Sequence, residues 1–143
     1  MRYDVVEELE DTGAVEEAVR RGIRGSDPPD VGARNWERVC LSLRDETGSI
    51  AGGVYGATMW GWLMVDGLWV FDGLRRRGLG SRLLANCEAL AQRRGCRGAW
   101  LGTFDFQAKG WYERRGYRVI GELPGFPEGH THYHLRKAFA GRS

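Results

Sequence analysis

A run of basic and small residues in the middle of the chain has the composition of an anion-binding site. In chain order the run is Arg75, Arg76, Arg77, Gly78, Leu79, Gly80 and Ser81. The arginines carry permanent positive charge, and the two glycines lack Cβ atoms where a ligand would approach the backbone. If a helix begins here, its first backbone N–H groups have no partners within the helix, and its dipole favours negative charge. The run therefore predicts a pocket for phosphate oxygens.

Two common phosphate-binding motifs do not fit this run. No Gly-x-x-x-x-Gly-Lys-Ser/Thr sequence is present, so the run is not a P-loop. A dinucleotide fingerprint would place a third glycine where Leu83 stands. The alternative to an anion site is a turn relaxed by its glycines and bordered by a solvated basic patch.

The residues on either side of the run predict the elements that position it. Residues 62–71 are apolar except for Asp66 and Gly67, which predicts a central strand buried on both faces. From Gly78 to Arg94 the apolar residues recur with helical spacing. The run thus joins the end of a buried strand to the start of a helix.

The rest of the chain predicts a mixture of strands and helices. Further strands are predicted over residues 3–9, 37–44, 49–59, 98–104, 117–123 and 131–138, and further helices over residues 14–21 and 107–115. The second and third of these strands are expected to form an antiparallel hairpin. No linker, repeat or low-complexity segment interrupts this order. We therefore expect one α/β domain over residues 1–143, built as a mixed α+β sandwich.

Composition and charge exclude several classes of protein. The 143 residues are 42% hydrophobic and 28% charged, with a net charge of +2, which does not demand a polyanionic partner. Three cysteines without a Cys-x-x-Cys pair favour neither a disulfide framework nor a zinc site. The acidic first ten residues are unlike a signal peptide, and no apolar run approaches the roughly 18 residues of a membrane span. We expect a cytoplasmic protein without a membrane partner.

Two segments resemble the signatures of the GNAT superfamily of N-acetyltransferases. Residues 70–80, VFDGLRRRGLG, are similar to the central motif of the family, Arg/Gln-x-x-Gly-x-Gly/Ala between a strand and a helix. Residues 108–117, AKGWYERRGY, are similar to its second signature, Ala-x-x-x-Tyr-x-x-x-Gly-Phe/Tyr. The resemblance extends from about residue 50 to the end of the chain, and it is only topological before that. Local sequence is similar to a bacterial subgroup of small enzymes.

This resemblance implies a fold and a cofactor. The fold is a mixed central sheet of about six to seven strands flanked by about four helices, splayed between the fourth and fifth strands. Acetyl-CoA would enter that gap, with its pantetheine arm along Leu68, Trp69 and Val70. Its pyrophosphate would accept hydrogen bonds from the backbone of residues 76–81, and Arg75 would support the phosphates or the loop. The family often has an Asn that touches the pantetheine where Asp105 stands here, so the chain departs from the family pattern at that position.

Acetyl transfer to an amine needs an acid for the departing thiolate and a base for the amine. By the family match, Tyr112 would be the acid, because a phenol is normally protonated at neutral pH. The alternative is a core tyrosine that packs under the sheet. Strand N–H groups at Trp69 or Val70 could stabilise the developing oxyanion.

Two residues are candidates for the base. Asp66 is the only carboxylate in the predicted central strand, on the face opposite Leu63, Val65 and Trp69, and burial could raise its pKa. It could instead cap a turn. His130, just before the last strand, is the other candidate, because an imidazole titrates near neutral pH. His130 also begins a His-x-His-x-His pattern, but the family has no catalytic metal, so we expect no metal site.

Aromatic residues are concentrated on the presumed acceptor side. Tyr55, Trp60 and Trp62 could form walls around an amine-bearing organic molecule. Few acidic clusters are present to attract a polyamine or a basic protein tail. The preferred acceptor class is therefore a small metabolite, an amino-acid-like compound or an antibiotic.

The sequence thus predicts transfer of an acetyl group from acetyl-CoA to a primary amine of a small molecule, by direct attack in a ternary complex. The alternatives are a nucleic-acid-binding module that uses the arginines and a non-catalytic acyl-CoA-binding regulator. Nineteen acidic residues offset the arginines, so we expect no nucleic-acid partner. Exposed strand edges and the family resemblance favour a homodimer.

Overall fold

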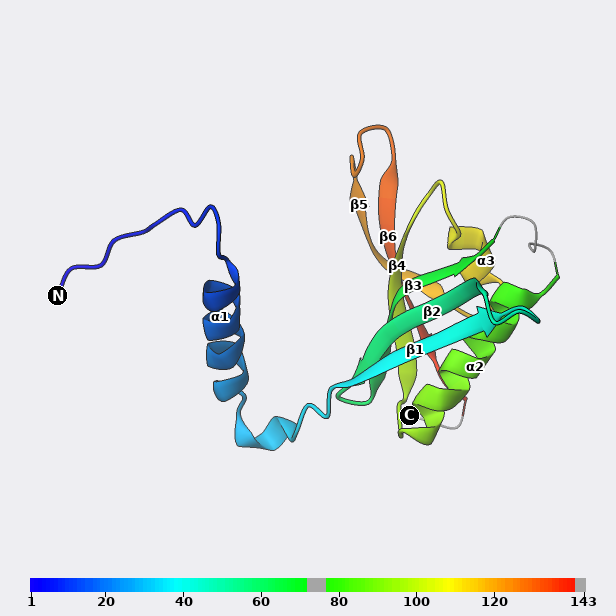
Figure 1. Cartoon of the computed structure of the whole chain (residues 1–143), viewed down its shortest axis with the longest axis horizontal. Coiled ribbons are helices and arrows are strands. Elements are labelled where there is room, and N and C mark those ends of the chain that lie inside the picture. Colours follow the sequence, from blue (N-terminus) through cyan, green and yellow to red (C-terminus); the bar gives the residue numbers. More distant parts are fainter. Residues whose placement is uncertain (72–76, 141–143) are drawn as a thin grey trace. The chain divides into compact units, whose positions relative to one another are not determined.

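The computed structural model describes residues 1–71 and 77–140, and the chain divides into two units, Met1–Ala33 and Arg34–Ser143 (Figure 1). The first unit holds helix α1 (Gly13–Gly25), which extends the predicted helix, and a 3₁₀ turn (Pro29–Val31). The strand predicted over residues 3–9 was wrong. No strand is assigned there, and Val5 is fully exposed. An extended segment becomes a strand only when a neighbouring strand pairs with its backbone groups. The single-domain expectation stays a prediction.

Six strands of the second unit form one mixed sheet in the order β1-β2-β3-β4-β6-β5. They are β1 (Glu37–Arg44), β2 (Ile50–Met59), β3 (Trp62–Val70), β4 (Gly98–Phe104), β5 (Arg118–Pro124) and β6 (Thr131–Ala138). Only β3 and β4 run parallel; the other neighbouring strands in the described sheet are antiparallel. The predicted mixed sheet flanked by helices is confirmed, with three α-helices in the described residues where about four were expected.

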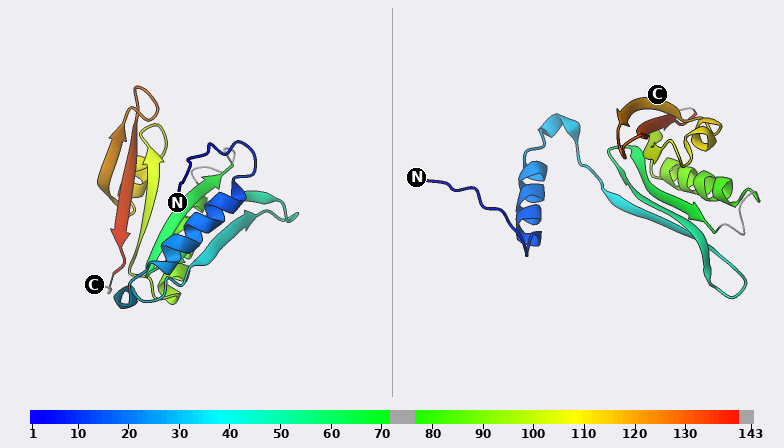
Figure 2. Two further views of the ribbon diagram at one scale, coloured as in Figure 1. Left: turned by 90° about the vertical axis from the view of Figure 1, so that its left-hand side faces the viewer. Right: turned by 90° about the horizontal axis from the view of Figure 1, so that it is seen from above.

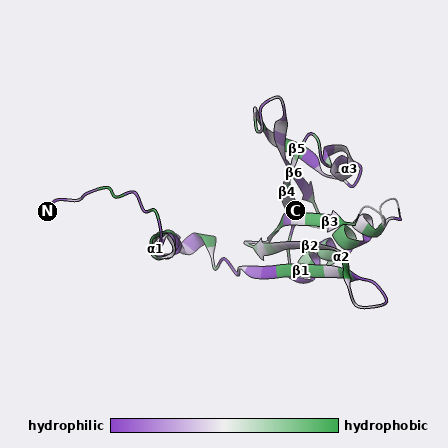
Figure 3. Cartoon of the chain, turned by 45° about the horizontal axis from the view of Figure 1, so that its top comes forward, coloured by the Kyte–Doolittle hydropathy of each residue, from purple (hydrophilic) through white to green (hydrophobic). Residues whose placement is uncertain are grey.

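Helix α2 (Leu79–Arg93) supplies the crossover that a parallel pair requires, and it packs on one face of the sheet. Its buried side chains are Leu83, Leu84, Cys87 and Ala91. They meet Val39, Val54 and Leu63 from the three strands on that side of the sheet. Figure 3 shows the corresponding hydrophobic segments of β1, β3 and α2 in green. The short helix α3 (Lys109–Glu113) adds Tyr112 to this core. We call the opposite side of the sheet the outer face.

The sheet opens between β3 and β4. The two strands pair only at one end, from Trp62 and Gly98 to Val65 and Leu101. Beyond these residues β3 continues to Val70, and β4 continues along a diverging course (Figure 2, left). The expected splay is therefore present. Because the first predicted strand is absent, it lies between the third and fourth strands of the described chain.

A β-bulge in β3 changes which residues face the core. Tyr55 of β2 pairs with Gly67, whereas the next residue of β2, Gly56, pairs with Val65, so Asp66 is an extra residue without a partner. Side chains alternate along a strand, and one inserted residue reverses the alternation. Trp69 therefore faces the side opposite Val65, which corrects the predicted shared face. Trp69 is 48% exposed and Asp66 is also exposed, so the expectation of a strand buried on both faces was wrong.

Candidate active site

A cleft of about 920 Å³ occupies the opening between β3 and β4. Its walls come from the diverging halves of both strands, from the start of α2 and from α3. The lining residues are Val65, Asp66, Gly67, Leu68, Trp69, Val70, Gly78, Leu79, Gly80, Ser81, Leu101, Gly102, Thr103, Phe106, Gln107, Ala108, Trp111, Tyr112 and Arg115. A cleft of this volume accommodates a cofactor-sized ligand.

The β3 wall of the cleft offers backbone groups. Beyond Val65, the edge of β3 that faces β4 has no strand partner within residues 1–71 and 77–140. Leu68, Trp69 and Val70, the residues predicted to hold the pantetheine arm, lie on this open stretch and line the cleft. An extended chain that carries amides can bind such an edge as an additional strand would.

The start of α2 offers a second set of backbone donors. Gly78 is the N-cap residue, with a positive φ of 72°, and as a glycine it has no side chain that could cap the helix start. Four of the residues predicted to bind the pyrophosphate, Gly78, Leu79, Gly80 and Ser81, line the cleft. Arg77 is exposed and is not one of the lining residues. Of the predicted phosphate-binding residues, Arg75 and Arg76 lie outside the described residues.

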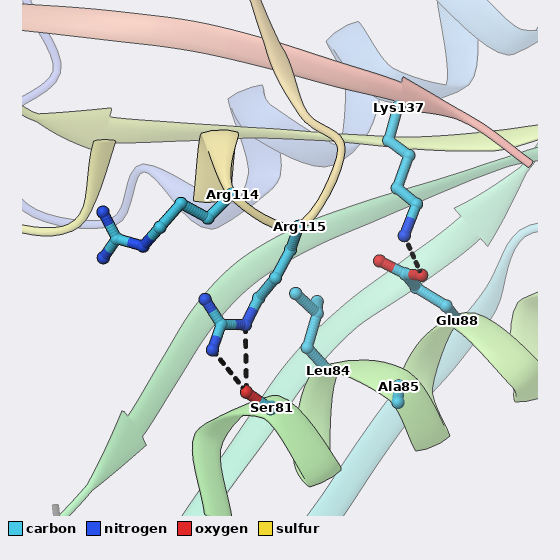
Figure 4. Close-up of a pocket in the computed structure, with 7 residues that line it drawn as sticks. All are labelled: Ser81, Leu84, Ala85, Glu88, Arg114, Arg115 and Lys137. Atoms are coloured by element: carbon cyan, nitrogen blue, oxygen red, sulfur yellow. Dashed lines mark hydrogen bonds and ion pairs between the residues drawn. The ribbon is translucent and has the colours of Figure 1, made fainter. Parts of the chain in front are cut away.

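Arg115 places a further positive charge at the start of α2. Its Nε donates to Ser81 Oγ at 3.0 Å, and Nη1 donates to the Trp111 carbonyl oxygen at 2.9 Å. The guanidinium also lies over the Trp111 ring, 3.8 Å from its centroid. Its described partners carry no negative charge. In Figure 4 Arg115 bends toward Ser81 at the edge of a second cavity of about 580 Å³. Arg115 therefore stands between this cavity and the cleft, both of which it lines.

Tyr112 lies on the core side of the cleft. It is only 7% exposed, and burial raises the pKa of its phenol, with a smaller contribution from the nearby Cys87. The hydroxyl group therefore remains protonated at neutral pH and is available as a proton donor. Tyr112 belongs to the hydrophobic core and also lines the cleft, so both interpretations of this residue are compatible with its position.

The two candidates for the base lie in different surroundings. Asp66 lines the cleft, but it is exposed on the bulge of β3, so the burial expected for it is absent. His130 lies in the loop before β6, where its Nδ1 is 2.9 Å from Asp105 Oδ1. The other oxygen of Asp105 accepts a hydrogen bond from the Thr131 N–H. Asp105 therefore links the end of β4 to the start of β6. His130 is bound to Asp105 and is not among the residues that line the cleft.

The three predicted aromatic contacts for the acceptor separate in the structure. Tyr55 lies against Gly67 on the cleft wall, since a Cβ atom on Gly67 would come within 2.5 Å of the Tyr55 ring. Trp60 and Trp62 instead lie at the opposite, paired end of β3, where Trp62 pairs with Gly98. The tight turn between β2 and β3 fixes them there. Tyr55 therefore lies beside the cleft and apart from Trp60 and Trp62, and the acceptor role of all three stays a prediction.

The three histidines of the His-x-His-x-His pattern do not lie together in the structure. His132 and His134 lie together on β6 with ring centroids 5.0 Å apart, whereas His130 turns to Asp105. Across the described part of the chain, no group of three or more His, Cys, Asp or Glu side chains is placed to hold a metal ion. Over the same residues, no helix combines the length and the apolar character needed to cross a bilayer.

The residues of the cleft fit acetyl-CoA. The open β3 edge suits the amides of the pantetheine arm, and the uncapped start of α2 with Arg115 suits the pyrophosphate. Gly80 is a close-approach position, because a Cβ atom there would lie 3.3 Å from the Trp111 ring. A side chain at this position would therefore crowd the cleft wall as well as cover the helix start.

Sequence reasoning missed two residues that line the cleft, Arg115 and Gly102. Arg115 carries a recognisable signal, because it follows Trp111 by four residues and so shares a helix face with it. Gly102 gives a weaker one, a glycine inside a predicted strand, which often marks a close approach.

Comparisons with known proteins agree with this site. Residues 7–117 match the model of the Acetyltransferase (GNAT) family. The chain is 46% identical over 110 residues to the blasticidin-S acetyltransferase of Streptomyces morookaense, covering 76% of this chain and 81% of that protein. The crystal structure of an acetyltransferase from Bacillus cereus superposes with a TM-score of 0.84 at 31% identity, covering 96% of this chain and 98% of the other.

A more distant structure shares the fold. It is an aminoglycoside 6′-N-acetyltransferase complexed with coenzyme A, with a TM-score of 0.67, 18% identity and coverage of 98% of this chain and 99% of that chain. The matched family model, the relatives and the cleft thus lead to one assignment: this chain belongs to the GNAT family and is an acetyl-CoA-dependent N-acetyltransferase.

Proposed function

We propose that this protein acetylates a primary amine of a small antibiotic-like molecule, by direct attack in a ternary complex. The acceptor class is supported by the 46% identity to a blasticidin-S acetyltransferase. It is also supported by the aromatic rings beside the cleft, those of Tyr55 on β2 and of His132 and His134 on β6. Blasticidin S is the first acceptor to test.

The residues of the cleft divide the work of binding. Backbone groups of Leu68, Trp69 and Val70 would hold the pantetheine arm, and those of residues 78–81, with Arg115, would hold the pyrophosphate. Acetyl-CoA supplies an acetyl group already activated as a thioester. Tyr112, kept protonated by burial, would give its proton to the departing thiolate sulfur.

One observation carries this proposal: the unpaired edge of β3 faces the uncapped start of α2 across one cleft. A strand edge recognises an extended chain with amides, and a helix start recognises an anion. Acetyl-CoA carries both features in one molecule. A nucleic acid has no counterpart to the first feature, so the geometry favours the cofactor over the nucleic-acid alternative.

The test is an acetylation assay with purified protein and acetyl-CoA. Blasticidin S, a streptothricin and an aminoglycoside are supplied in turn, and thiol release is followed together with the mass of the acceptor. We expect thiol release in step with the addition of one acetyl group to blasticidin S. Cofactor binding without acetylation of any amine would support the regulator alternative instead.

We also propose a homodimer and a cytoplasmic location. The strands at the two ends of the sheet, β1 and β5, each leave one edge without a strand partner in the part of the chain that the structure describes. A second copy of the chain could pair with or cover such an edge. The three cysteines are free thiols, as is usual in a reducing compartment. Light scattering coupled to gel filtration tests the dimer, and a monomer mass across micromolar concentrations would contradict it.

A further inference from the structure

We propose that His132 is the residue that accepts the proton of the acceptor amine, from a position on the outer face beside the cleft. This inference rests on the proposed function, since it names the base for the same acetyl transfer. It replaces the two candidates predicted from the sequence, Asp66 and His130.

The His132 ring packs on the outer face over Gly102, a residue of β4 that lines the cleft; His132 itself is beside the cleft and is not one of its lining residues. Gly102 lines the cleft, and a Cβ atom on Gly102 would come 2.6 Å from Cε1 and 2.8 Å from Nε2 of His132. The imidazole therefore occupies the space that a side chain on β4 would otherwise fill. On the β3 wall, Tyr55 covers Gly67 in the same way. The outer mouth of the cleft is thus bordered by one aromatic ring on each wall, and His132 is the one with an acid–base group.

Neighbouring rings hold His132 in this position. Its centroid lies 4.5 Å from Phe104 in an edge-to-face arrangement and 5.7 Å from Phe126. These contacts fix the orientation of the imidazole and remove water from one side of it. A base whose ring is held in place needs little reorganisation before it receives a proton.

The charges around His132 favour its neutral form. Burial lowers the pKa of its imidazole, and the nearby His134 lowers it further. Among the elements packed against it, β6 contributes His134, β4 contributes Phe104, and β5 contributes Leu123 at the paired position. Asp105, the carboxylate that follows Phe104 at that end of β4, is already bound to His130 and to the Thr131 N–H. His132 is therefore an acceptor of protons at neutral pH rather than a cation.

The proton balance of the reaction gives His132 a defined task. The acceptor begins as an ammonium with three N–H bonds and ends as an amide with one. The new C–N bond forms and the C–S bond of the thioester breaks, and the sulfur leaves as a thiol, which accounts for one proton. The other proton must be released. His132 Nε2 takes it from the ammonium, which frees the lone pair for attack, and passes it to solvent beside the exposed His134.

The test compares three single variants, each of which removes one candidate base: His132→Gln, His130→Gln and Asp66→Asn. The rate constant kcat/KM for the amine is measured across pH, and acetyl-CoA binding is measured by calorimetry in each variant. We expect His132→Gln to lower kcat by about 100-fold and to remove the acidic limb of the pH profile, with acetyl-CoA affinity unchanged. The acidic limb is expected to remain in His130→Gln and in Asp66→Asn.

A readout without turnover accompanies the kinetics. The imidazole resonances of the protein without ligands are titrated by NMR, and the His132→Gln spectrum assigns the missing signal. The pKa of that signal should coincide with the acidic limb of the wild-type profile. In His134→Gln the pKa of His132 should rise toward its ordinary value, so the acidic limb should move to higher pH.

The possible outcomes distinguish failure of the assignment of His132 from failure of the proposed function. If the wild type acetylates an amine but His132→Gln retains the rate and the acidic limb, His132 is not the base. Loss of the acidic limb in His130→Gln or Asp66→Asn alone would assign the base to that residue. If the wild type acetylates no amine in the panel, the proposed function fails before this inference is reached. If His132→Gln does not fold, the His134→Gln shift decides the question.

Discussion

On the helix side of the cleft, the groups offered to a ligand are mostly backbone: the open edge of β3 and the uncapped start of α2. On the outer face, they are side-chain rings, with Tyr55 over Gly67 and His132 over Gly102. The first side requires only that a strand ends and a helix begins in the right place. The second requires individual side chains at individual positions.

This difference indicates which part of the enzyme can change its specificity. Backbone donors bind any ligand with the right anion and amides, so substitutions along β3 would leave the cofactor site largely intact. The outer face would change its acceptor with each side chain. A family that keeps one cofactor and acts on many amines would be built in this manner.

The largest expected effect concerns Tyr112, which lines the cleft from the core side. Tyr112→Phe removes the proposed proton donor but preserves the buried ring, so we expect kcat to fall about 100-fold. The calorimetric affinity for acetyl-CoA should remain near that of the wild type. An unchanged kcat would show that Tyr112 is only a core residue.

A smaller effect is expected from the cofactor side alone. Arg115→Ala removes a guanidinium from the start of α2, and we expect the Kd for acetyl-CoA to rise about tenfold. Arg114→Ala is the matched control, because Arg114 is exposed on the neighbouring position and does not line the cleft. Equal losses in both variants would indicate a general charge effect instead of a phosphate contact.

The acceptor side should respond separately. Tyr55→Ala uncovers Gly67 and removes one aromatic wall, and we expect the KM for the amine to rise about fivefold. Acetyl-CoA affinity in the same protein should not change. If the Kd for acetyl-CoA rose in parallel, the two sides would not be independent.

The smallest expected effect concerns a hydrogen bond between Tyr117 and Glu88, residues that do not line the cleft. The Tyr117 hydroxyl donates to Glu88 Oε2 at 2.7 Å, and Lys137 Nζ pairs with the other oxygen at 2.7 Å, as Figure 4 shows for the lysine. Tyr117→Phe removes one hydrogen bond, so we expect the free energy of unfolding to fall by about 1 kcal/mol. Denaturant unfolding measures this loss, and kcat and KM should stay at wild-type values.

Local patterns predicted the helix side well. The start of α2 could be predicted because its glycines and the first apolar residues with helical spacing lie within a few positions of one another. The β6 boundaries, Thr131–Ala138, also agree with prediction. In contrast, the strand expected over residues 3–9 depends on a pairing partner, which a local pattern does not reveal.

The side chains of the outer face were harder to predict, because one extra residue in β3 changes which side chains point to that face. Asp66 adds a bulge, and the side chains after it change faces, which moved Trp69 away from Val65. Trp62 belongs to the paired end of β3 because the hairpin turn sets the register. His130 and His132 alternate in sequence, but the contact with Asp105 separates them. Each of these outcomes depends on contacts between segments distant in the chain.

The most direct test of the account is a calorimetric titration of acetyl-CoA into the wild type and into Gly80→Glu. The substituted side chain would place a negative charge at the start of α2 and crowd Trp111, which a Cβ atom at this position already approaches to 3.3 Å. We predict a wild-type Kd on the order of micromolar and at least about 100-fold weaker binding in the variant. Equal binding by a Gly80→Glu protein that unfolds like the wild type, or no binding by the wild type at millimolar acetyl-CoA, would contradict the placement of the cofactor in this cleft.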